Sequence, residues 1–196
     1  LRSALGERLQ AGVNLARYTA ARLGGAADLF FEAQSIEDLV QVASICWEYD
    51  IPFVLLGGGS NVLISDAGVR GLVMINKAKD VRFVEDELVP TVRAESGANL
   101  GLIARQSAQR GFSGLEWAAG IPGTVGGAVV GNAGAFGEDM AGNLIVADIL
   151  HRTRGNAGDI CRLEEWTVDR LGYAYRNSNL KKQLGQDIVL AAALRL

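Results

Sequence analysis

The sequence EWAAGIPGTVGGAVVGNAGAFGED, residues 116–139, has seven glycines among Ile, Val, Ala, Phe and Pro, and after Glu116 it carries no charge until Glu138. A flexible linker would instead combine its glycines with Ser, Lys and Glu. Glycine among apolar residues indicates backbone that is buried and closely approached, because glycine exposes its N–H and C=O groups without a Cβ. We therefore expect this backbone to lie against a flat group with polar edges that is larger than a side chain.

A second glycine cluster, Gly57, Gly58, Gly59, Ser60 and Asn61, follows the apolar run 53–56. Successive glycines allow several backbone N–H groups to converge on one anion, and the last two side chains add donors. A loop that binds a nucleoside triphosphate would carry a Lys directly after its second glycine, and this cluster has none. The two clusters together favour a dinucleotide-type cofactor with a flavin ring and a pyrophosphate that is bound but not cleaved. Residues 116–139 alone are also compatible with a turn before a tightly packed helix.

The bulk composition restricts the class of protein. A chain of 196 residues with 49% hydrophobic residues fits one large domain or two small ones. The net charge of −3 argues against a nucleic-acid binder, and no long unbroken apolar run predicts a membrane span. Cys46 and Cys161 are too few for a disulfide scaffold, and no metal-binding spacing exists. The one histidine, His151, is expected at the surface or in a hydrogen bond.

Hydrophobic periodicity predicts interleaved helices and strands, and therefore an α+β fold. The expected helices cover residues 3–10, a segment that begins after the capping residue Ser35 and includes Trp47 in its apolar face, and 100–110 after the capping residue Asn99. The expected strands are 28–32, a buried strand 53–56, 71–75, a hairpin 81–84 with 89–95, 144–152, 159–163 and a central strand 188–196. Alternation around residue 174 would place Tyr173 and Tyr175 on one face and Arg176 with Ser178 on the other.

Three motifs resemble those of the UDP-N-acetylenolpyruvoylglucosamine reductase (UDP-N-acetylmuramate dehydrogenase) family. They are the segment Leu56–Leu63, the segment Gly120–Ala128 with Gly131–Gly137, and Tyr175-Arg176-Asn177-Ser178. Each motif alone is a weak signal, but their order and spacing agree with that family over essentially the whole chain.

The resemblance implies a two-lobed FAD-binding domain of the vanillyl-alcohol-oxidase/PCMH type. Residues 1–76 would form one lobe and residues 77–196 the other, with FAD between them. The resemblance also implies NADPH as the reductant, UDP-N-acetylenolpyruvoylglucosamine as the substrate and UDP-N-acetylmuramate as the product, in cytoplasmic peptidoglycan precursor synthesis. A monomer or weak oligomer is expected, with no metal, nucleic-acid or membrane partner.

The resemblance also implies roles for individual residues. The loop 57–61 would bind the FAD pyrophosphate. Arg176 matches the family's catalytic arginine, which stabilises the carboxylate and the enolate-like charge, and Tyr175 would pack beside the substrate. The residues expected to line the flavin and ribityl chain are Gly120, Pro122, Gly123, Thr124, Gly126, Gly127, Asn132, Gly134 and Ala135, with Asn132 as a side-chain donor.

The family continues into a further domain that supplies a protonating serine and a glutamate. Because the apolar strand 188–196 ends abruptly, we expect that domain to be absent from this chain. Two alternatives remain open: a truncated FAD-binding module without catalysis, and another flavoprotein oxidase of the same fold. Such oxidases often tether flavin through His or Cys near the glycine loops, and residues 50–150 contain neither.

Overall fold

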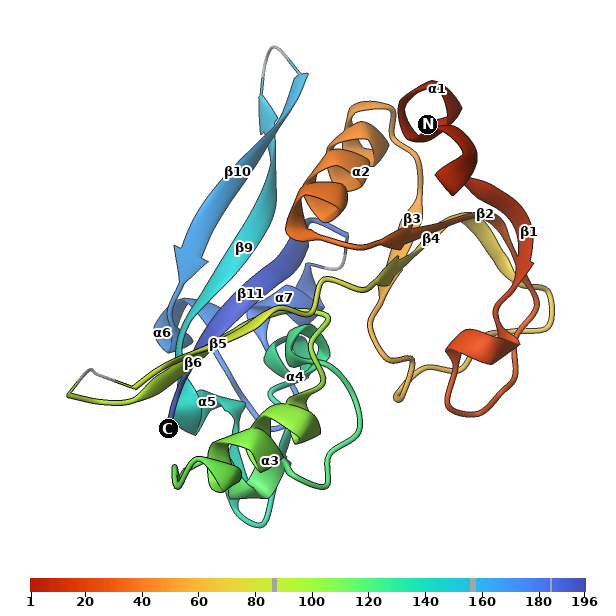
Figure 1. Cartoon of the computed structure of the whole chain (residues 1–196). Helices are drawn as coiled ribbons and strands as arrows, with labels where there is room; N and C mark the ends of the chain where they lie inside the picture. The colour runs from red at the N-terminus through yellow and green to blue at the C-terminus, as the bar shows by residue number, and fades with distance from the viewer. Residues whose placement is uncertain (86–87, 156–157, 184) are drawn as a thin grey trace. The chain divides into compact units, whose positions relative to one another are not determined.

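The computed structural model describes residues 1–85, 88–155, 158–183 and 185–196, in two compact units (Figure 1). The first unit contains residues 1–78 and 152–161, and the second contains residues 79–151 and 162–196. Both units combine helices with a sheet, so the predicted α+β class is confirmed. The division after Ala78 lies close to the predicted lobe boundary, and the assignment of each lobe to cofactor binding stays a prediction.

The first unit is built on a four-stranded sheet in the order β1-β2-β4-β3. Its strands are β1 (Gln10–Asn14), β2 (Ala26–Ala33), β3 (Phe53–Leu56) and β4 (Val69–Asn76). β4 pairs in parallel with both β2 and β3, and β1 pairs antiparallel with β2. Helix α2 (Ile36–Glu48) connects β2 to β3, as a parallel arrangement requires (Figure 1).

Helix α2 follows the predicted pattern closely. The hydroxyl of Ser35 accepts a hydrogen bond from the Asp38 N–H (3.3 Å) and so caps the first turn. The apolar face of the helix is buried, including Trp47, whose ring lies 5.9 Å from that of Phe53. Trp47 is therefore a core residue, as expected from its helical spacing.

Two sequence expectations for the first unit need correction, the helix at residues 3–10 and the burial of strand 53–56. The helix predicted for residues 3–10 ends early, as α1 (Arg2–Leu5) and the 3₁₀ turn η1 (Gly6–Arg8), before β1 begins. A second 3₁₀ turn, η2 (Ala16–Tyr18), follows β1. β3 is only partly buried, because Val54 is exposed. Residues 62–64 form no regular element.

The second unit is built on a five-stranded sheet in the order β10-β9-β11-β6-β5. Its strands are β5 (Val81–Val84), β6 (Thr91–Glu95), β9 (Leu144–Gly155), β10 (Gly158–Trp166) and β11 (Asp187–Arg195). β5 and β6 form the predicted antiparallel hairpin. Of the acidic residues 85–87 that connect its two predicted strands, 86 and 87 lie outside the described residues. β11 pairs with both β6 and β9, so it is the central strand that its unbroken apolar character predicted.

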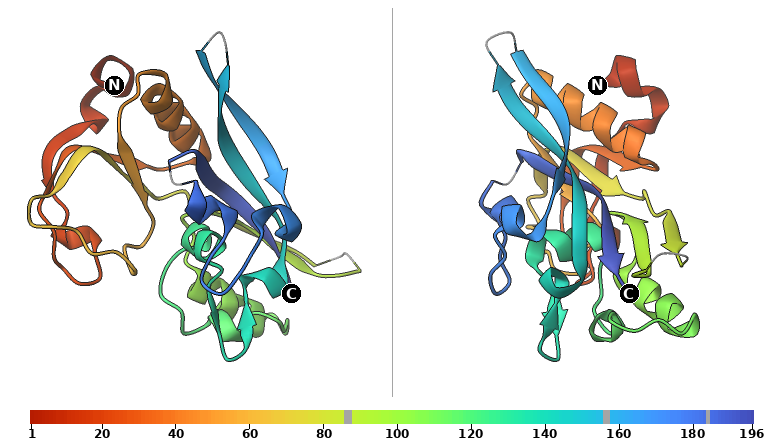
Figure 2. Two further views of the ribbon diagram at one scale, coloured as in Figure 1. Left: turned by 180° about the vertical axis from the view of Figure 1, so that it is seen from behind. Right: turned by 90° about the vertical axis from the view of Figure 1, so that its left-hand side faces the viewer.

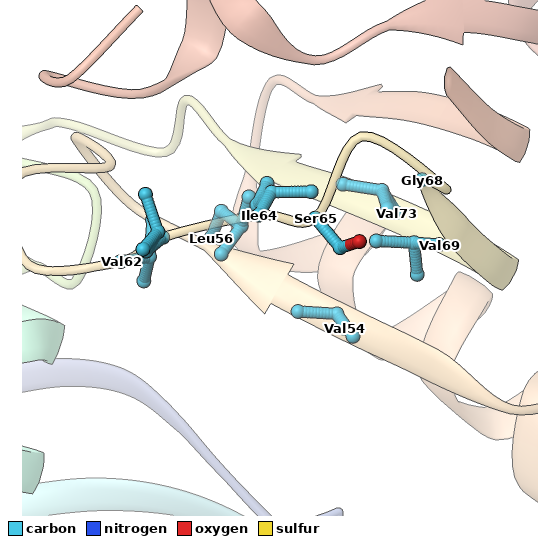
Figure 3. Close-up of a pocket in the computed structure, with 9 residues that line it drawn as sticks. Val54, Leu56, Val62, Ile64, Ser65, Gly68, Val69 and Val73 are labelled. Atoms are coloured by element: carbon cyan, nitrogen blue, oxygen red, sulfur yellow. The ribbon is translucent and has the colours of Figure 1, made fainter. Parts of the chain in front are cut away.

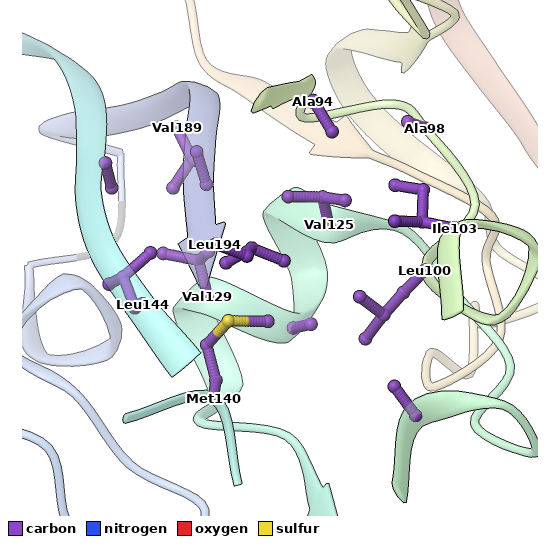
Figure 4. Close-up of a cluster of buried hydrophobic side chains, with 14 of the residues drawn as sticks. Ala94, Ala98, Leu100, Ile103, Val125, Val129, Met140, Leu144, Val189 and Leu194 are labelled. Carbon is purple, nitrogen blue, oxygen red and sulfur yellow. The ribbon is translucent and has the colours of Figure 1, made fainter. Parts of the chain in front are cut away.

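Short helices and turns cover this sheet and enclose the larger hydrophobic core. They are α3 (Leu100–Gln109), η3 (Glu116–Ala118), α4 (Val125–Gly131), α5 (Met140–Asn143), α6 (Val168–Leu171) and α7 (Asn179–Lys182), with the small hairpin β7 (Gly134–Ala135) and β8 (Glu138–Asp139). The Asn99 side chain caps α3 by accepting from the Leu102 N–H (2.8 Å), as predicted. Leu194, Val125, Val129 and Met140 meet in the core between α4 and the sheet (Figure 4).

The long hairpin of β9 and β10 contributes to both units (Figure 2). Its residues 152–161 group with the first unit, where the Arg152 side chain donates to the Trp47 carbonyl (3.1 Å) and to Asp50 Oδ1 (2.6 Å). Because a cation near a helix C-terminus is favourable, Arg152 stabilises the end of α2. The sequence predicts a turn at residues 154–158 between the two strands, and residues 156 and 157 of it lie outside the described residues.

Candidate functional site

The first glycine loop, residues 57–61, follows β3 in the first unit. A Cβ on Gly59 would lie 1.9 Å from the Tyr18 carbonyl oxygen, and the Gly59 carbonyl accepts from the Ala20 N–H (3.0 Å). Gly59 also has a φ of +63°, in the left-handed region. The protein's own fold therefore requires glycine at Gly59, whereas Gly58 beside it is exposed.

An apolar groove of about 290 Å³ begins where this loop ends (Figure 3). Leu56 and Val62, which flank the loop, both line it, and Leu63 is 77% exposed. The remaining lining residues are Val54, Ile64, Ser65, Gly68, Val69 and Val73. Residues 62–64 therefore line this groove. An apolar groove beside a glycine loop can accept a flat ring whose attached phosphates lie at the loop.

The second glycine segment, in the second unit, contains a helix that the sequence analysis did not assign. Thr124 caps α4 by accepting from the Gly127 N–H (3.4 Å). A Cβ on Gly126 would lie 2.9 Å from the Ser96 Cβ, and the Gly126 N–H donates to the Ser96 carbonyl (2.8 Å). The alternative of a turn before a tightly packed helix thus accounts for Gly126.

Other glycines of this segment have different surroundings. A Cβ on Gly134 would lie 2.4 Å from the Glu138 carbonyl oxygen, because Gly134 and Ala135 form the tight hairpin β7–β8. In contrast, a Cβ on Gly120 would meet nothing within 4 Å, and one on Gly127 would meet only Thr124 Oγ1 at 3.7 Å. Packing therefore does not exclude a side chain at these two positions, and space for a ligand remains beside their backbone. Pro122 is exposed, and Gly123 adopts a φ of +130°.

Asn132 ends α4 in the left-handed conformation and is only 4% exposed. Its Nδ2 donates to Asp139 Oδ2 (2.9 Å) and to the Ala174 carbonyl (3.2 Å), and its Oδ1 accepts from the Ala141 N–H (3.1 Å). Both amide hydrogens are used within the unit, so the geometry gives Asn132 a structural role. Its expected donation to a cofactor stays a prediction.

Arg176 lies in a turn and not in a strand, so the predicted alternation of residues 173–178 is wrong. Tyr173 turns inward and donates to the Val129 carbonyl (2.9 Å), while Tyr175 is 90% exposed. Arg176 Nη2 donates to the Gly134 carbonyl (2.6 Å), and its guanidinium lies 5.6 Å from the centre of the Tyr175 ring. The structure thus brings Arg176, with the Tyr175 ring beside its guanidinium, to the second glycine segment.

The tip of the β7–β8 hairpin carries Phe136, an aromatic residue that the site prediction omitted. Phe136 is 95% exposed and has a φ of +56°. An aromatic side chain between glycines, in Gly134-Ala135-Phe136-Gly137, was the available sequence signal. Exposed aromatic rings of this kind can pack against a planar ligand.

The remaining candidate groups have local partners. His151 Nδ1 lies 2.5 Å from Asp187 Oδ1, as expected for a hydrogen-bonded histidine. Among the described residues, no group of His, Cys, Asp or Glu is arranged to hold a metal ion. The described helices include none that is long and apolar enough to cross a membrane.

Comparison with known proteins agrees with these features. The family described as FAD binding domain matches residues 27–154. The UDP-N-acetylenolpyruvoylglucosamine reductase of Synechocystis sp. is 41% identical over 192 residues, and that of Rubrobacter xylanophilus is 44% identical over 182 residues. These alignments cover 97% and 93% of this chain. The chain spans 58% of the length of each of these curated relatives.

Solved structures give the same result for the fold. The UDP-N-acetylenolpyruvylglucosamine reductase from Thermus caldophilus is similar with a TM-score of 0.70 and 30% identity, over 93% of this chain and 60% of that one. Cholesterol oxidase from Brevibacterium sterolicum has a TM-score of 0.67 at 14% identity, over 95% of this chain and 37% of that one, which is a likeness of fold alone. The predicted FAD-binding fold and the resemblance that led to it are confirmed.

Proposed function

Because this chain belongs to the family of FAD binding domains, we propose that it forms the FAD-binding part of a UDP-N-acetylenolpyruvoylglucosamine reductase. The proposed reaction uses NADPH to reduce the enolpyruvyl group of the substrate and gives UDP-N-acetylmuramate, a precursor of peptidoglycan. Bound FAD supplies the hydride transfer, from NADPH to the enolpyruvyl carbon. The proposal implies that the protein acts in the cytoplasm, as a monomer or weak oligomer.

In the first unit, we assign the pyrophosphate of FAD to the loop Gly57, Gly58, Gly59, Ser60 and Asn61. The exposed backbone at Gly58 supports this assignment, because its N–H group can approach phosphate oxygens without a Cβ in the way. The adjoining apolar groove also supports this assignment, because it can accept a flat ring of the cofactor next to the pyrophosphate. In this assignment the loop binds the pyrophosphate through neutral donors, and its lack of a lysine fits a pyrophosphate that is bound but not cleaved.

In the second unit, we assign the flavin and ribityl chain to the segment that contains Gly120, Pro122, Gly123, Thr124, Gly126, Gly127, Asn132, Gly134 and Ala135. The open backbone at Gly120 and Gly127 supports this assignment most directly. Gly126, Gly134 and Asn132 contribute by shaping the segment, because each is fixed by contacts within the unit. The cofactor-binding backbone is thus held rigid before the ligand arrives.

Arg176 is the proposed catalytic residue. A guanidinium remains charged at any working pH and can bind a carboxylate through parallel hydrogen bonds. The Arg176 side chain is exposed, and its Nη2 donates to the Gly134 carbonyl, so the other N–H groups of the guanidinium can face a substrate carboxylate. Tyr175, exposed beside it, is the proposed packing surface for the substrate.

The observation that carries this proposal is the hydrogen bond from Arg176 Nη2 to the Gly134 carbonyl (2.6 Å). It joins the cation that would stabilise developing negative charge to the segment that would hold the hydride donor. Electrostatic stabilisation of this kind is typically worth ~10²–10³ in rate.

The first test is FAD binding by the purified chain, measured by flavin fluorescence and absorption. The second is stopped-flow measurement of both half-reactions in the gene product that contains this chain. Arg176→Ala should leave flavin reduction by NADPH nearly intact and should slow reoxidation by the enolpyruvyl substrate by about 10²–10³. Equal slowing of both steps, or failure of the chain to bind FAD, would contradict the proposal.

A further inference from the structure

The turn that carries Arg176 is fastened to the end of a helix by side chains on both sides of the arginine. Before it, Tyr173 Oη donates to the Val129 carbonyl (2.9 Å), and after it, Ser178 Oγ donates to the Val130 carbonyl (2.6 Å). Both carbonyls belong to the last turn of α4, which contacts α7 (Figure 1). These two hydrogen bonds therefore fix the turn to α4 on either side of the arginine.

These bonds fill acceptor positions that a helix leaves open. The last carbonyls of an α-helix have no partner within the helix and need other donors. The Ala128 carbonyl accepts from the Ala133 N–H (3.0 Å), and the next two carbonyls accept from Tyr173 and Ser178. Ser178 is fully buried and also caps α7 by accepting from the Lys181 N–H (3.4 Å). Loss of either hydroxyl would leave a carbonyl of α4 without its donor.

The turn itself needs such support. Arg176 has a φ of +54°, which is unfavourable for a residue with a Cβ and persists only when the surroundings fix it. Within the turn, Ala174 and Asn177 exchange two backbone hydrogen bonds of 3.1 Å. The Ala174 carbonyl also accepts from Asn132 Nδ2 (3.2 Å).

We infer that Tyr173 and Ser178 are positioning residues for Arg176, which they hold against the glycine segment by fixing the turn to the C-terminal end of α4. This inference rests on the proposed role of Arg176. Burial raises the pKa of the Tyr173 hydroxyl, so it stays protonated and keeps donating over the range in which an enzyme works. The two residues need no contact with substrate, because their effect passes through the backbone on either side of the arginine.

The test uses Tyr173→Phe and Ser178→Ala, each of which removes a single hydroxyl. Ser107→Ala is the matched control, since Ser107 is equally buried in the same unit and its hydroxyl donates to the Ile103 carbonyl (3.0 Å) in α3. In the cofactor-free chain, hydrogen exchange of the Asn177 amide should become roughly tenfold faster in both test variants, the usual effect of one lost hydrogen bond. The control should leave this amide unchanged.

The rates of the two half-reactions distinguish a positioning role from general destabilisation, because destabilisation would not slow one half-reaction selectively. Both test variants should slow reoxidation by the enolpyruvyl substrate by roughly tenfold while flavin reduction by NADPH stays within about twofold of the unmodified protein. Ser107→Ala should change neither step. Unchanged exchange at Asn177, or slowing of both half-reactions alike, would overturn the inference. If Ser178→Ala does not fold, Tyr173→Phe, which keeps its ring in the core, decides the question alone.

This outcome is distinguishable from failure of the proposed function. If Arg176→Ala itself leaves reoxidation unaffected, the role of the arginine is wrong, whatever the two hydroxyl variants do. If Arg176→Ala slows reoxidation and the hydroxyl variants do not, the proposed function stands and the positioning role is wrong.

Discussion

Two neighbouring glycines of α4 should respond in opposite ways to the same substitution. At Gly126 an added Cβ would lie 2.9 Å from the Ser96 Cβ and 3.1 Å from the Ser96 carbonyl oxygen. These segments cannot separate freely, because the Gly126 N–H donates to that carbonyl and the Ser96 N–H donates to the Leu190 carbonyl in β11 (both 2.8 Å). At Gly127 the added Cβ would meet only Thr124 Oγ1, at an ordinary 3.7 Å.

The magnitude follows from two terms. Replacing glycine by alanine within a helix gains up to ~1 kcal/mol in both variants, so this term largely cancels in the comparison. Forcing a methyl group into a packed site costs ~1–3 kcal/mol, and only Gly126→Ala bears this cost. Gly127→Ala should therefore raise the free energy of unfolding, and Gly126→Ala should lie about 1–3 kcal/mol below it.

Urea denaturation of the cofactor-free chain, followed by circular dichroism, measures this difference directly. For a chain of this size, ~1 kcal/mol corresponds to roughly 2–4 °C in Tm, so thermal unfolding gives a second measurement. Equal stability of the two variants, or greater stability of Gly126→Ala, would refute the account of α4 as a helix packed through Gly126.

Three further predictions concern other parts of the chain. The Arg8 side chain donates to the Asp38 carboxylate and thereby lowers the pKa of that carboxyl. The interaction therefore stabilises the fold fully above the usual pKa of Asp, and this stabilisation is lost as the pH falls through the lowered pKa. Since Arg8 is half-exposed, Arg8→Met should cost only about 0.5–1 kcal/mol at pH 7, and urea denaturation at pH 3 should show a smaller gap; a constant gap would refute this. Gly58→Val should weaken FAD binding by at least about tenfold in a fluorescence titration, and unchanged affinity would rule out a close phosphate there. Burial raises the pKa of Cys46 to about 11, so a thiol reagent at pH 8 should label the partly exposed Cys161 first, and the reverse order would contradict the structure.

The sequence predicted the features that depend on local signals. The caps at Ser35 and Asn99 were recognisable because a side chain bonds the backbone three residues further on. The central position of β11 was recognisable because a strand buried on both faces has no polar alternation. The cofactor family followed from the order and spacing of three motifs, since each is specified by residues close together in the chain.

Features that depend on distant partners were missed. α4 was not predicted because Val125–Gly131 contains several glycines and is a poor helix by propensity, yet its contact with Ser96 and the core stabilises it. β1 was missed because four of its five residues are exposed and its pairing partner β2 lies further along the chain. The inward orientation of Tyr173 depends on a carbonyl 44 residues earlier, which no local alternation could indicate.

The central position of β11 also affects how the protein can be made. Its partner β6 (Thr91–Glu95) is synthesised long before residues 187–195 leave the ribosome. Until then, β6 and β9 each present an unpaired edge where β11 will insert, and such edges invite association with other nascent chains. We therefore expect the second unit to close only once residues 187–195 have been synthesised, and its unfinished sheet to be prone to association until then.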